Sequence, residues 1–470
     1  MSFNWSLILH LGVLYGAIVL ATFIRTKVAF FQKYLIPNPL LAGFILLPLY
    51  NFVLPRFGLE QLGLGEIAYH LLSISFVSLT LKKSPGKNNS RKEIVPMAMA
   101  FVFQFGLQAF IGLILTFMFI QTLIPDLFHS FGYLLALGFI QGPGPAFSIG
   151  QSWASFGVVD GGNIGLTFAA IGFIFCSFGG VFLINFGIRR EWISRESVAF
   201  LLNRDLLSGV HPAGTDLPVG AYQTTESEAI DSFSLHIGLV FIGYLLAYLF
   251  LTALTWALSF LGDAGMQLAE TFWGLNFIFA AVMGMLIKSV LTLTNQRHII
   301  DNLTLNRISG FSVDLMVTSA IAAISLVVVT RYWLPITVMS VTGGALVLLS
   351  SIWYSSRVFK DHRFQRALLV FGVSTGTLST GLALLRVVDP NFETPVATDY
   401  GYASGIIFLM MIPYILAINL PLQTYQSGNY LYFWLSVGIS LIYLLLGTLY
   451  LGLRSGWGSL KISGSIWTVK

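Results

Sequence analysis

Apolar stretches, each close to the length of a membrane-spanning helix, recur along this entire chain. A helix needs about 20 mostly apolar residues to cross a lipid bilayer. Only 10% of the 470 residues are charged and 56% are hydrophobic, whereas a soluble domain has about 25% charged residues. So few charges cannot cover a water-facing surface. The sequence therefore predicts an all-α polytopic membrane protein whose outer surface faces lipid.

About eleven stretches satisfy the length rule for a crossing. The one that begins at Glu66 is the shortest and is rich in serine. The predicted crossings are Trp5–Ile24, Leu35–Leu54, Glu66–Leu81, Ile94–Ile124, Ile164–Ile188, Phe233–Leu261, Phe272–Leu293, Ile308–Thr330, Trp333–Tyr354, Tyr402–Leu420 and Tyr430–Leu453.

Two further apolar stretches, near Tyr133–Phe156 and Ala367–Val388, are interrupted in the middle by Gly, Pro, Ser or Thr. We call them the first and the second broken segment. Proline lacks a backbone N–H group, and glycine permits non-helical dihedral angles, so a helix is expected to break at these positions. Inside a membrane, the freed backbone groups must be buried in protein or line a water-filled cavity.

Basic residues collect in the loops after every second predicted crossing. These loops all fall on one side of the membrane only if the first broken segment enters and leaves on the same side, as a re-entrant hairpin. The second broken segment is given the same interpretation from its matching position. The rule then places the N-terminus outside and the C-terminus in the cytoplasm, in the cell (inner) membrane. The basic residues are Arg25, Lys27, Lys33, Lys82, Lys83, Lys87, Arg91, Lys92, Arg189, Arg190, Arg195, Arg204, Lys288, Arg297, Arg307, Arg357, Lys360, Arg363 and Arg366.

The order of these elements predicts two repeats of inverted topology, each with about five crossings and one re-entrant hairpin. Residues 1–188 form the first repeat, with its hairpin near 133–156. A polar cytoplasmic linker covers 189–231, and the second repeat covers 232–424, with its hairpin near 367–388. Residues 425–470 add an extra crossing and a cytoplasmic tail. Matching broken segments in inverted repeats indicate the binding site of a secondary transporter.

The candidate binding residues come mainly from the two broken segments. Hydroxyl and backbone oxygens suit sodium, while the start of a half-helix suits an anionic group. The competing interpretation is that both segments are kinks in ordinary packed helices. The candidates are Gln141, Gly142, Gly144 and Ser148 in the first segment and Ser374, Thr375, Gly376, Thr377, Ser379 and Thr380 in the second, with sodium expected at the hydroxyls of the second.

A few polar residues lie inside or near predicted crossings. Asp314 is either a functional carboxylate or a hydrated group close to the cytoplasmic end of its helix. Arg386 either pairs with Asp389, lies at the surface, or receives a solute carboxylate. Gln104 and Gln108 share one helix face, and we expect them to hydrogen-bond between helices rather than touch a solute.

Enzyme motifs are absent from the sequence. It contains neither a His-Glu-x-x-His pair nor a Walker phosphate loop, and Cys176 is its only cysteine. The letters Gly372-Val373-Ser374-Thr375-Gly376 match a nucleophile elbow but lack the strand that gives the elbow its meaning. We therefore expect no enzyme, no cofactor and no nucleic-acid partner. Without a nucleotide-binding loop, transport would be driven by an ion gradient.

The chain resembles the bacterial sodium/glutamate symporter family over roughly residues 5 to 422. The run Ile36–Gly43 is similar to that family's Ile-Pro-x-Pro-x-x-x-Gly motif, and Leu137–Gly150 and Gly372–Leu384 fall where the family keeps two glycine-rich pore loops. Asn419 falls near the end of a similar closing span. The first loop departs from the family, because Gln141–Ala146 lacks its His and Thr.

The resemblance implies a homodimer in which hairpin tips from opposite sides meet at the solute, and a transport domain that moves past a scaffold. The leading hypothesis is a sodium-coupled symporter for glutamate or a related small carboxylate or amino acid, working by alternating access. Two alternatives stay open. One is a carrier of another small organic anion that couples to protons through Asp314. The other is a channel or sensor on the same fold that has lost transport.

Overall fold

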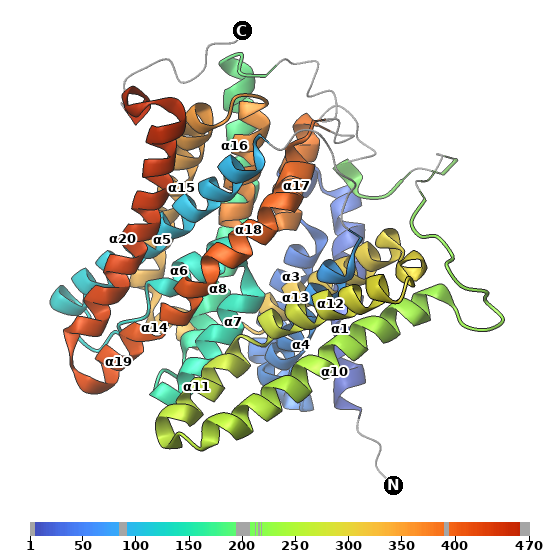
Figure 1. Ribbon diagram of the computed structural model, residues 1–470, viewed down its shortest axis with the longest axis horizontal. Helices are drawn as coiled ribbons and strands as arrows, with labels where there is room; N and C mark the ends of the chain where they lie inside the picture. The colour runs from blue at the N-terminus through green and yellow to red at the C-terminus, as the bar shows by residue number, and fades with distance from the viewer. Residues whose placement is uncertain are drawn as a thin grey trace.

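The structure is a computed structural model that describes residues 5–83, 92–193, 207–211, 213–214, 217, 219–389 and 394–460. All its regular elements within these ranges are helices. The first described helix, α1 (Ser6–Lys27), begins near the bottom of Figure 1, and the last long helix, α20 (Tyr430–Ser455), ends near the top. Parts of the predicted linker (194–206, 212, 215–216 and 218) and the tail from 461 onward lie outside the described residues.

Nine helices of the described chain are long and apolar enough to cross a membrane. With so few charged residues, the apolar outer faces of these helices must face lipid rather than water. The predicted class of polytopic helical membrane protein is therefore confirmed. The helices are α1 (Ser6–Lys27), α4 (Gln61–Leu81), α5 (Ile94–Thr122), α8 (Gly161–Arg189), α10 (Ser232–Ser259), α12 (Asn276–Leu293), α15 (Trp333–Val358), α18 (Val396–Ala417) and α20 (Tyr430–Ser455).

Two of the eleven predicted crossings differ from these nine. Helix α3 (Asn38–Phe52) has only 15 residues, so it is shorter than a standard crossing. The predicted crossing Ile308–Thr330 is wrong as a single helix, because α13 (Asn302–Ala322) ends before α14 (Leu326–Arg331) begins. Between them, Asn163 accepts a hydrogen bond from the Ser325 N–H group, and Asn51 accepts one from the Leu326 N–H group. These amides satisfy backbone groups that the break would otherwise leave unpaired.

One group of helices is centred on α4 and α13, which pack against each other. Helix α3 packs on α13 and α12 packs on α4, while α1 lies against α3 and α10 lies against α12. Small residues permit the close contacts: a side chain at Gly284 of α12 would meet Thr80 of α4, and one at Gly43 of α3 would meet Ile321 of α13. In Figure 1 this group occupies the right-hand side.

A second group on the left of Figure 1 contains α5, α15 and α20. Helix α5 packs between α20 and α18, and α15 packs against α8. A side chain at Gly106 of α5 would overlap the α20 backbone at Leu444, 2.6 Å away. Glycine at this position therefore allows the two helices to touch through their backbones.

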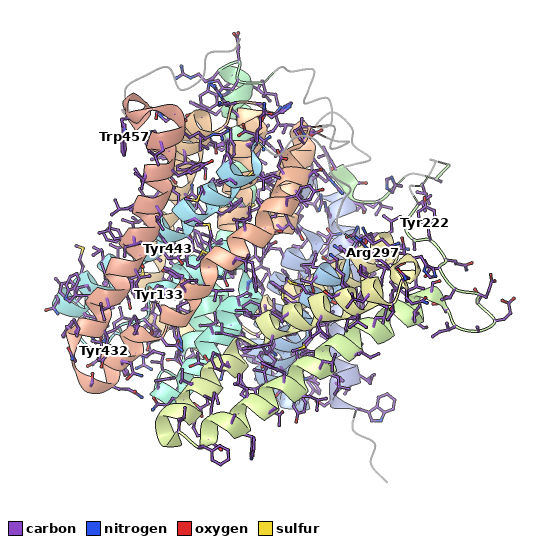
Figure 2. The ribbon with its side chains drawn as sticks, viewed as in Figure 1. Tyr133, Tyr222, Arg297, Tyr432, Tyr443 and Trp457 are labelled. Atoms are coloured by element: carbon purple, nitrogen blue, oxygen red, sulfur yellow. The ribbon has the colours of Figure 1, made fainter. Side chains whose placement is uncertain are left out.

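Short elements connect the long helices. Helix α11 (Gly262–Gly274) follows α10, and α19 (Leu420–Ser427) precedes α20. The end of the linker packs on the first group, because the Tyr222 N–H group donates to Asp301 just before α13; Figure 2 places Tyr222 near Arg297 on that side of the molecule. The remaining short helices are α2 (Ala29–Lys33), η1 (Leu54–Phe57), η5 (Arg297–Ile299) and η6 (Trp457–Leu460).

Candidate functional site

The first broken segment consists of α6 (Tyr133–Ala136), a π-helical turn η2 (Leu137–Gln141), α7 (Pro143–Ser152) and η3 (Trp153–Phe156). The break lies at Gly142, whose φ of +83° belongs to the region that favours glycine. Pro143 follows as the first residue of α7, where its missing N–H group costs nothing and its fixed φ starts a helix. The local sequence therefore explains the break.

The second broken segment consists of α16 (Arg363–Thr375) and α17 (Leu378–Val388), separated by Gly376 and Thr377. Thr377 and Thr380 form a capping box at the start of α17, because the hydroxyl of each accepts a hydrogen bond from the other's backbone N–H group. This reciprocal cap ends one helix and begins the next without proline.

The two breaks touch each other. A side-chain carbon built on Gly142 would lie 2.7 Å from Cγ2 of Thr377 and 3.7 Å from the carbonyl oxygen of Gly376. Helix α7 lies in the lower half of Figure 1, whereas α16 and α17 lie in the upper half. Two segments more than 200 residues apart in the sequence thus approach from opposite sides and meet inside the molecule.

Helices α5 and α8 form walls beside the second break. Gln108 of α5 donates from Nε2 to the carbonyl oxygen of Ser374 at 3.0 Å. The α8 backbone approaches closely at Gly172, where an added side chain would lie 2.5 Å from the carbonyl oxygen of Thr375. Cys176, one turn further along α8, donates weakly to the Gly372 carbonyl oxygen. The end of α16 is therefore held by the amide of Gln108 and by a close backbone contact that glycine at position 172 permits.

Two oxygen atoms next to this break have no hydrogen-bond partner among the described residues. They are Oγ of Ser374 and Oε1 of Gln108, and both side chains are buried. Leaving such groups unpaired costs about 1–3 kcal/mol each. Buried polar atoms without partners call for an explanation, and an ion or a bound molecule is one.

The start of α7 differs chemically from the start of α17. Pro143 and Pro145 lack N–H groups, and the Ala146 N–H group already donates to the Gly142 carbonyl oxygen. In this first turn only Gly144 has an N–H group that the helix does not use, and a side-chain carbon added at Gly144 would meet Leu72 and Met316. An anion would find one donor here. At the start of α17, by contrast, the first helical turn leaves the N–H groups of Leu378 and Ser379 free.

The other candidates of the first broken segment lie along its outer arm. Gln141 is half-buried next to the break. Ser148, one and a half turns further along, donates to the carbonyl oxygen of Gly274 and so ties α7 to α11. Asn419 accepts a hydrogen bond from the Trp153 indole and donates to Thr271. Asn419 and Ser148 therefore both attach this arm to neighbouring helices.

Asp314 and Arg386 lie away from the contact between the breaks. Met316 of α13 touches Gly144, and two residues correspond to about 200° of helical rotation, so Asp314 leaves the other side of α13, where it is exposed. Arg386 occupies the last turn of α17 and is also exposed. Neither side chain joins the oxygens near Ser374.

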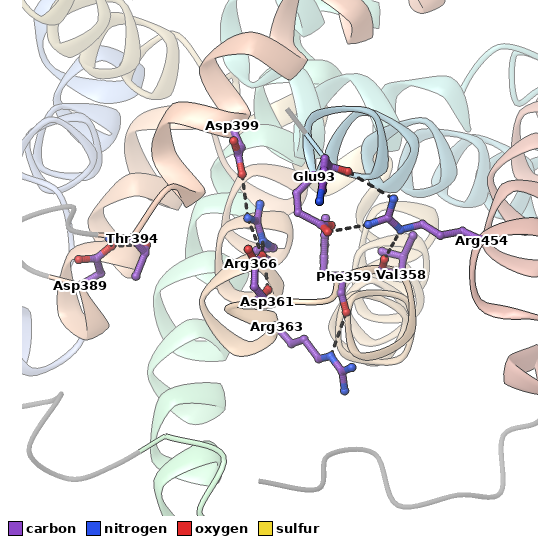
Figure 3. Close-up of polar contacts among 11 residues, drawn as sticks. Glu93, Val358, Phe359, Asp361, Arg363, Arg366, Asp389, Thr394, Asp399 and Arg454 are labelled. Atoms are coloured by element: carbon purple, nitrogen blue, oxygen red, sulfur yellow. Dashed lines mark hydrogen bonds and ion pairs between the residues drawn. The ribbon is translucent and has the colours of Figure 1, made fainter. Parts of the chain in front are cut away.

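A buried ion-pair cluster anchors the start of α16 (Figure 3). The Arg366 side chain is fully buried, and its Nη2 lies 2.8 Å from Oδ1 of Asp361 and 2.7 Å from Oδ2 of Asp399 on α18. A second pair joins Arg454 of α20 to Glu93, at the start of α5, over 2.6 Å. Burial raises the pKa of the Glu93 carboxyl, while the positive charges of Arg454 and Arg366 oppose that rise. The Arg366–Asp399 pair connects the base of the second broken segment to α18, and the Arg454–Glu93 pair connects α20 to the start of α5.

The interhelical role predicted for Gln104 and Gln108 is confirmed, whereas the buried role of Arg366 is not predicted. Gln104 bonds Ser350 and Ser351 of α15, which is the interhelical role predicted for it. Gln108 also bonds between helices as predicted, and its partner is the Ser374 carbonyl oxygen of α16, next to the second break. The sequence places Arg366 only among the basic loop residues. An arginine directly before an apolar run is the one sequence signal that suggests a buried ion pair here.

No protein-family model, curated protein or solved structure matches this chain. The resemblance to the sodium/glutamate symporter family therefore stays a prediction from the sequence.

Proposed function

We propose that this protein is a cation-coupled secondary transporter whose two broken segments act as re-entrant hairpins in an alternating-access cycle. The contact between Gly142 and Thr377, beside the unpartnered oxygens of Ser374 and Gln108, carries this proposal. Irregular backbone at membrane depth is tolerated where it is buried or lines a cavity, and transporters place ion and solute sites at such breaks.

Helix packing supports the proposal of two inverted repeats. The pairs α1–α3 and α10–α12 occupy corresponding places in the two halves, as do the pairs α3–α13 and α12–α4. The first half thus contributes α1, α3 and α4 to this group, and the second half contributes α10, α12 and α13. A two-fold axis between these two helices would generate this exchange. The helices α5, α8, α15 and α18, with both hairpins, would then form the transport domain that moves past the scaffold.

Sodium is the proposed coupling ion. Sodium is a hard cation that prefers oxygen ligands, and a hydroxyl oxygen keeps acceptor capacity even while it donates. The hydroxyls near the second break provide such ligands together with Gln108. Ser374 has the free oxygen, whereas the hydroxyl of Thr375 donates to Phe371 and that of Thr380 donates to Thr377. Ser379 is exposed at the start of α17.

The proposed solute is glutamate or a related small carboxylate or amino acid, as the family resemblance implies. Its carboxylate would bind the free N–H groups at the start of α17, because α7 keeps only one such donor. The positive-inside rule would place the basic loops in the cytoplasm and the N-terminus outside. The homodimer implied by the resemblance stays a prediction.

Uptake of radiolabelled amino acids and carboxylates into proteoliposomes tests this function. We expect accumulation that requires an inward sodium gradient and that shows counterflow, which separates a carrier from a channel. The absence of sodium-driven accumulation for every solute of this class would refute the proposal. Uptake that is driven by a proton gradient in the absence of sodium would refute sodium as the coupling ion. Asp314→Asn is expected to leave sodium coupling intact, because its side chain lies away from the breaks.

A further inference from the structure

A cavity of about 550 Å³ lies between α4, α7 and α11. Its volume is in the range of sites for small organic molecules and is far larger than an inorganic ion requires. The outer arm of the first broken segment forms one wall, and Ser148 and Gly274 line it where they join α7 to α11. About six residues of α7, or roughly 9 Å, separate Ser148 from the break at Gly142.

Every charge that lines this cavity is negative. Glu66 of α4 and Glu270 of α11 both contribute exposed side chains, and none of the ten described lining residues is basic. Helices α7 and α11 also end at this cavity, with Ser152 and Gly274 in its wall. The C-terminal end of a helix carries a partial negative charge. The cavity therefore favours positively charged groups over negatively charged ones.

Aromatic rings complete the lining. Tyr69, Phe147 and Trp273 all face the cavity, and aromatic faces attract ammonium groups. Hydrogen bonds hold two of these rings in place: the Tyr69 hydroxyl donates to the Trp273 carbonyl oxygen at 2.7 Å, and the Trp273 indole donates to Thr255 at 3.0 Å. Rings fixed before binding lose little freedom when a ligand arrives.

We propose that this cavity binds the ammonium group of an organic cation or zwitterion. If the proposed transport function holds, on which this rests, the solute reaches the hairpins through this cavity. The solute then carries an amino or quaternary ammonium group. Two carboxylates and aromatic rings together recognise such a group better than sodium, which gains little from a cavity of this size. A dicarboxylate without an amino group would be repelled.

Calorimetric titration of the detergent-purified full-length protein tests the cavity directly, with tetramethylammonium chloride as the probe. We expect saturable binding that equimolar sodium chloride does not displace, and none of the neutral isostere tert-butanol. Glu66→Gln, Glu270→Gln and Trp273→Leu should each weaken the affinity by roughly ten-fold. Glu60→Gln and Trp256→Leu provide matched controls, because both residues are exposed and lie outside the cavity lining.

Binding that is absent, or unchanged in all three cavity variants, would overturn the assignment. Full displacement by sodium would show an inorganic cation site instead and would also overturn it. Sodium-driven uptake separates this inference from the proposed function. Rapid uptake of a dicarboxylate without an amino group would overturn the solute class. Tetramethylammonium binding without any sodium-driven uptake would support the cavity site while refuting the transport function.

Discussion

At the scale of single residues, the hydroxyl of Ser374 is the feature that most needs an explanation. Its hydroxyl is buried beside the second break and has no partner in the described part of the chain. A buried hydroxyl without a partner lowers stability, and alanine at this position would avoid that cost. Binding of an ion by the hydroxyl oxygen explains why serine is present. The same reasoning applies to Oε1 of Gln108, which shares the site.

Replacing Ser374 by alanine should have opposite effects with and without sodium. In sodium-free buffer the variant should be more stable by about 1 kcal/mol or more, because an unpaired buried hydroxyl is removed. The stabilisation that sodium gives to the wild type through binding should shrink or disappear. Thermal unfolding in detergent, measured across a sodium titration, checks both effects.

Ser355→Ala is the matched control for this change. Ser355 is also buried with an unpartnered hydroxyl, but it lies in the last turn of α15. Its removal should raise stability without altering the sodium response. An unaltered sodium response in Ser374→Ala would contradict a role for this hydroxyl in ion binding.

Two features require glycine at position 142: its positive φ and its close contact with Thr377. A pair of variants distinguishes the two. Gly142→Ala should be unfavourable because φ is +83° and because the added carbon would lie 2.7 Å from Thr377. Gly157→Ala has a similar φ of +88°, but its added carbon would meet only Tyr425 at 3.9 Å. Both should lose about 1–2 kcal/mol from backbone strain, and Gly142→Ala should lose more.

Transport rates in proteoliposomes, together with unfolding temperatures, test this pair. We expect Gly142→Ala to abolish or strongly slow transport by separating the two breaks, whereas Gly157→Ala should retain it. Equal transport by both variants would show that the contact between the breaks has no functional role.

At the scale of elements, the position of α16 depends on charges at its start. Asp399→Asn should destabilise the protein by about 3–5 kcal/mol, because it removes one partner from a fully buried guanidinium. Asp399 is 3% exposed, whereas Asp361, the other partner of Arg366, is 45% exposed. Asp361→Asn should cost clearly less, because water screens that pair and the Asp361 backbone oxygen still accepts from Nε.

Thermal unfolding of both variants in detergent checks this difference. A similar loss in the two variants would mean that burial does not set the strength of the cluster. The sequence could not predict this ion-pair cluster, because Arg366 and Asp399 meet only when α16 packs against α18.

Helix prediction succeeded where apolar length alone decides and failed where polar contacts intervene. The helix over Ile308–Thr330 stops at Ala322 because Asn163 and Asn51 offer hydrogen bonds to the backbone that follows. These asparagines come from α8 and α3, far away in the sequence. Hydrophobic periodicity carries no information about such partners.

At the scale of the whole molecule, the proposed topology predicts which loops face the outside. Cys176 is the only cysteine and is buried, so Cys176→Ala gives a background for labelling. We expect Leu123→Cys and Leu261→Cys to react with a membrane-impermeant maleimide in intact cells. Gln296→Cys and Lys360→Cys should react only after the membrane is made permeable.

Two of these positions, 123 and 261, are predicted to lie outside, and the other two, 296 and 360, in the cytoplasm. Complete reversal of the labelling would contradict the orientation derived from the basic loops. Labelling of Leu123→Cys and Leu261→Cys from different sides would contradict the inverted repeats, because the first re-entrant hairpin lies between these positions in the sequence.

The sequence by itself determined the membrane class, most helix positions and the sites where two helices break. Apolar length, proline and glycine act locally, so these features need no knowledge of distant neighbours. The tertiary structure alone decided that Gly142 meets Thr377, that Gln108 reaches Ser374 across 266 positions of the chain, and that Glu66 and Glu270 share one cavity. Such meetings depend on how packed helices bring remote residues together, and no local pattern of residue types records that arrangement.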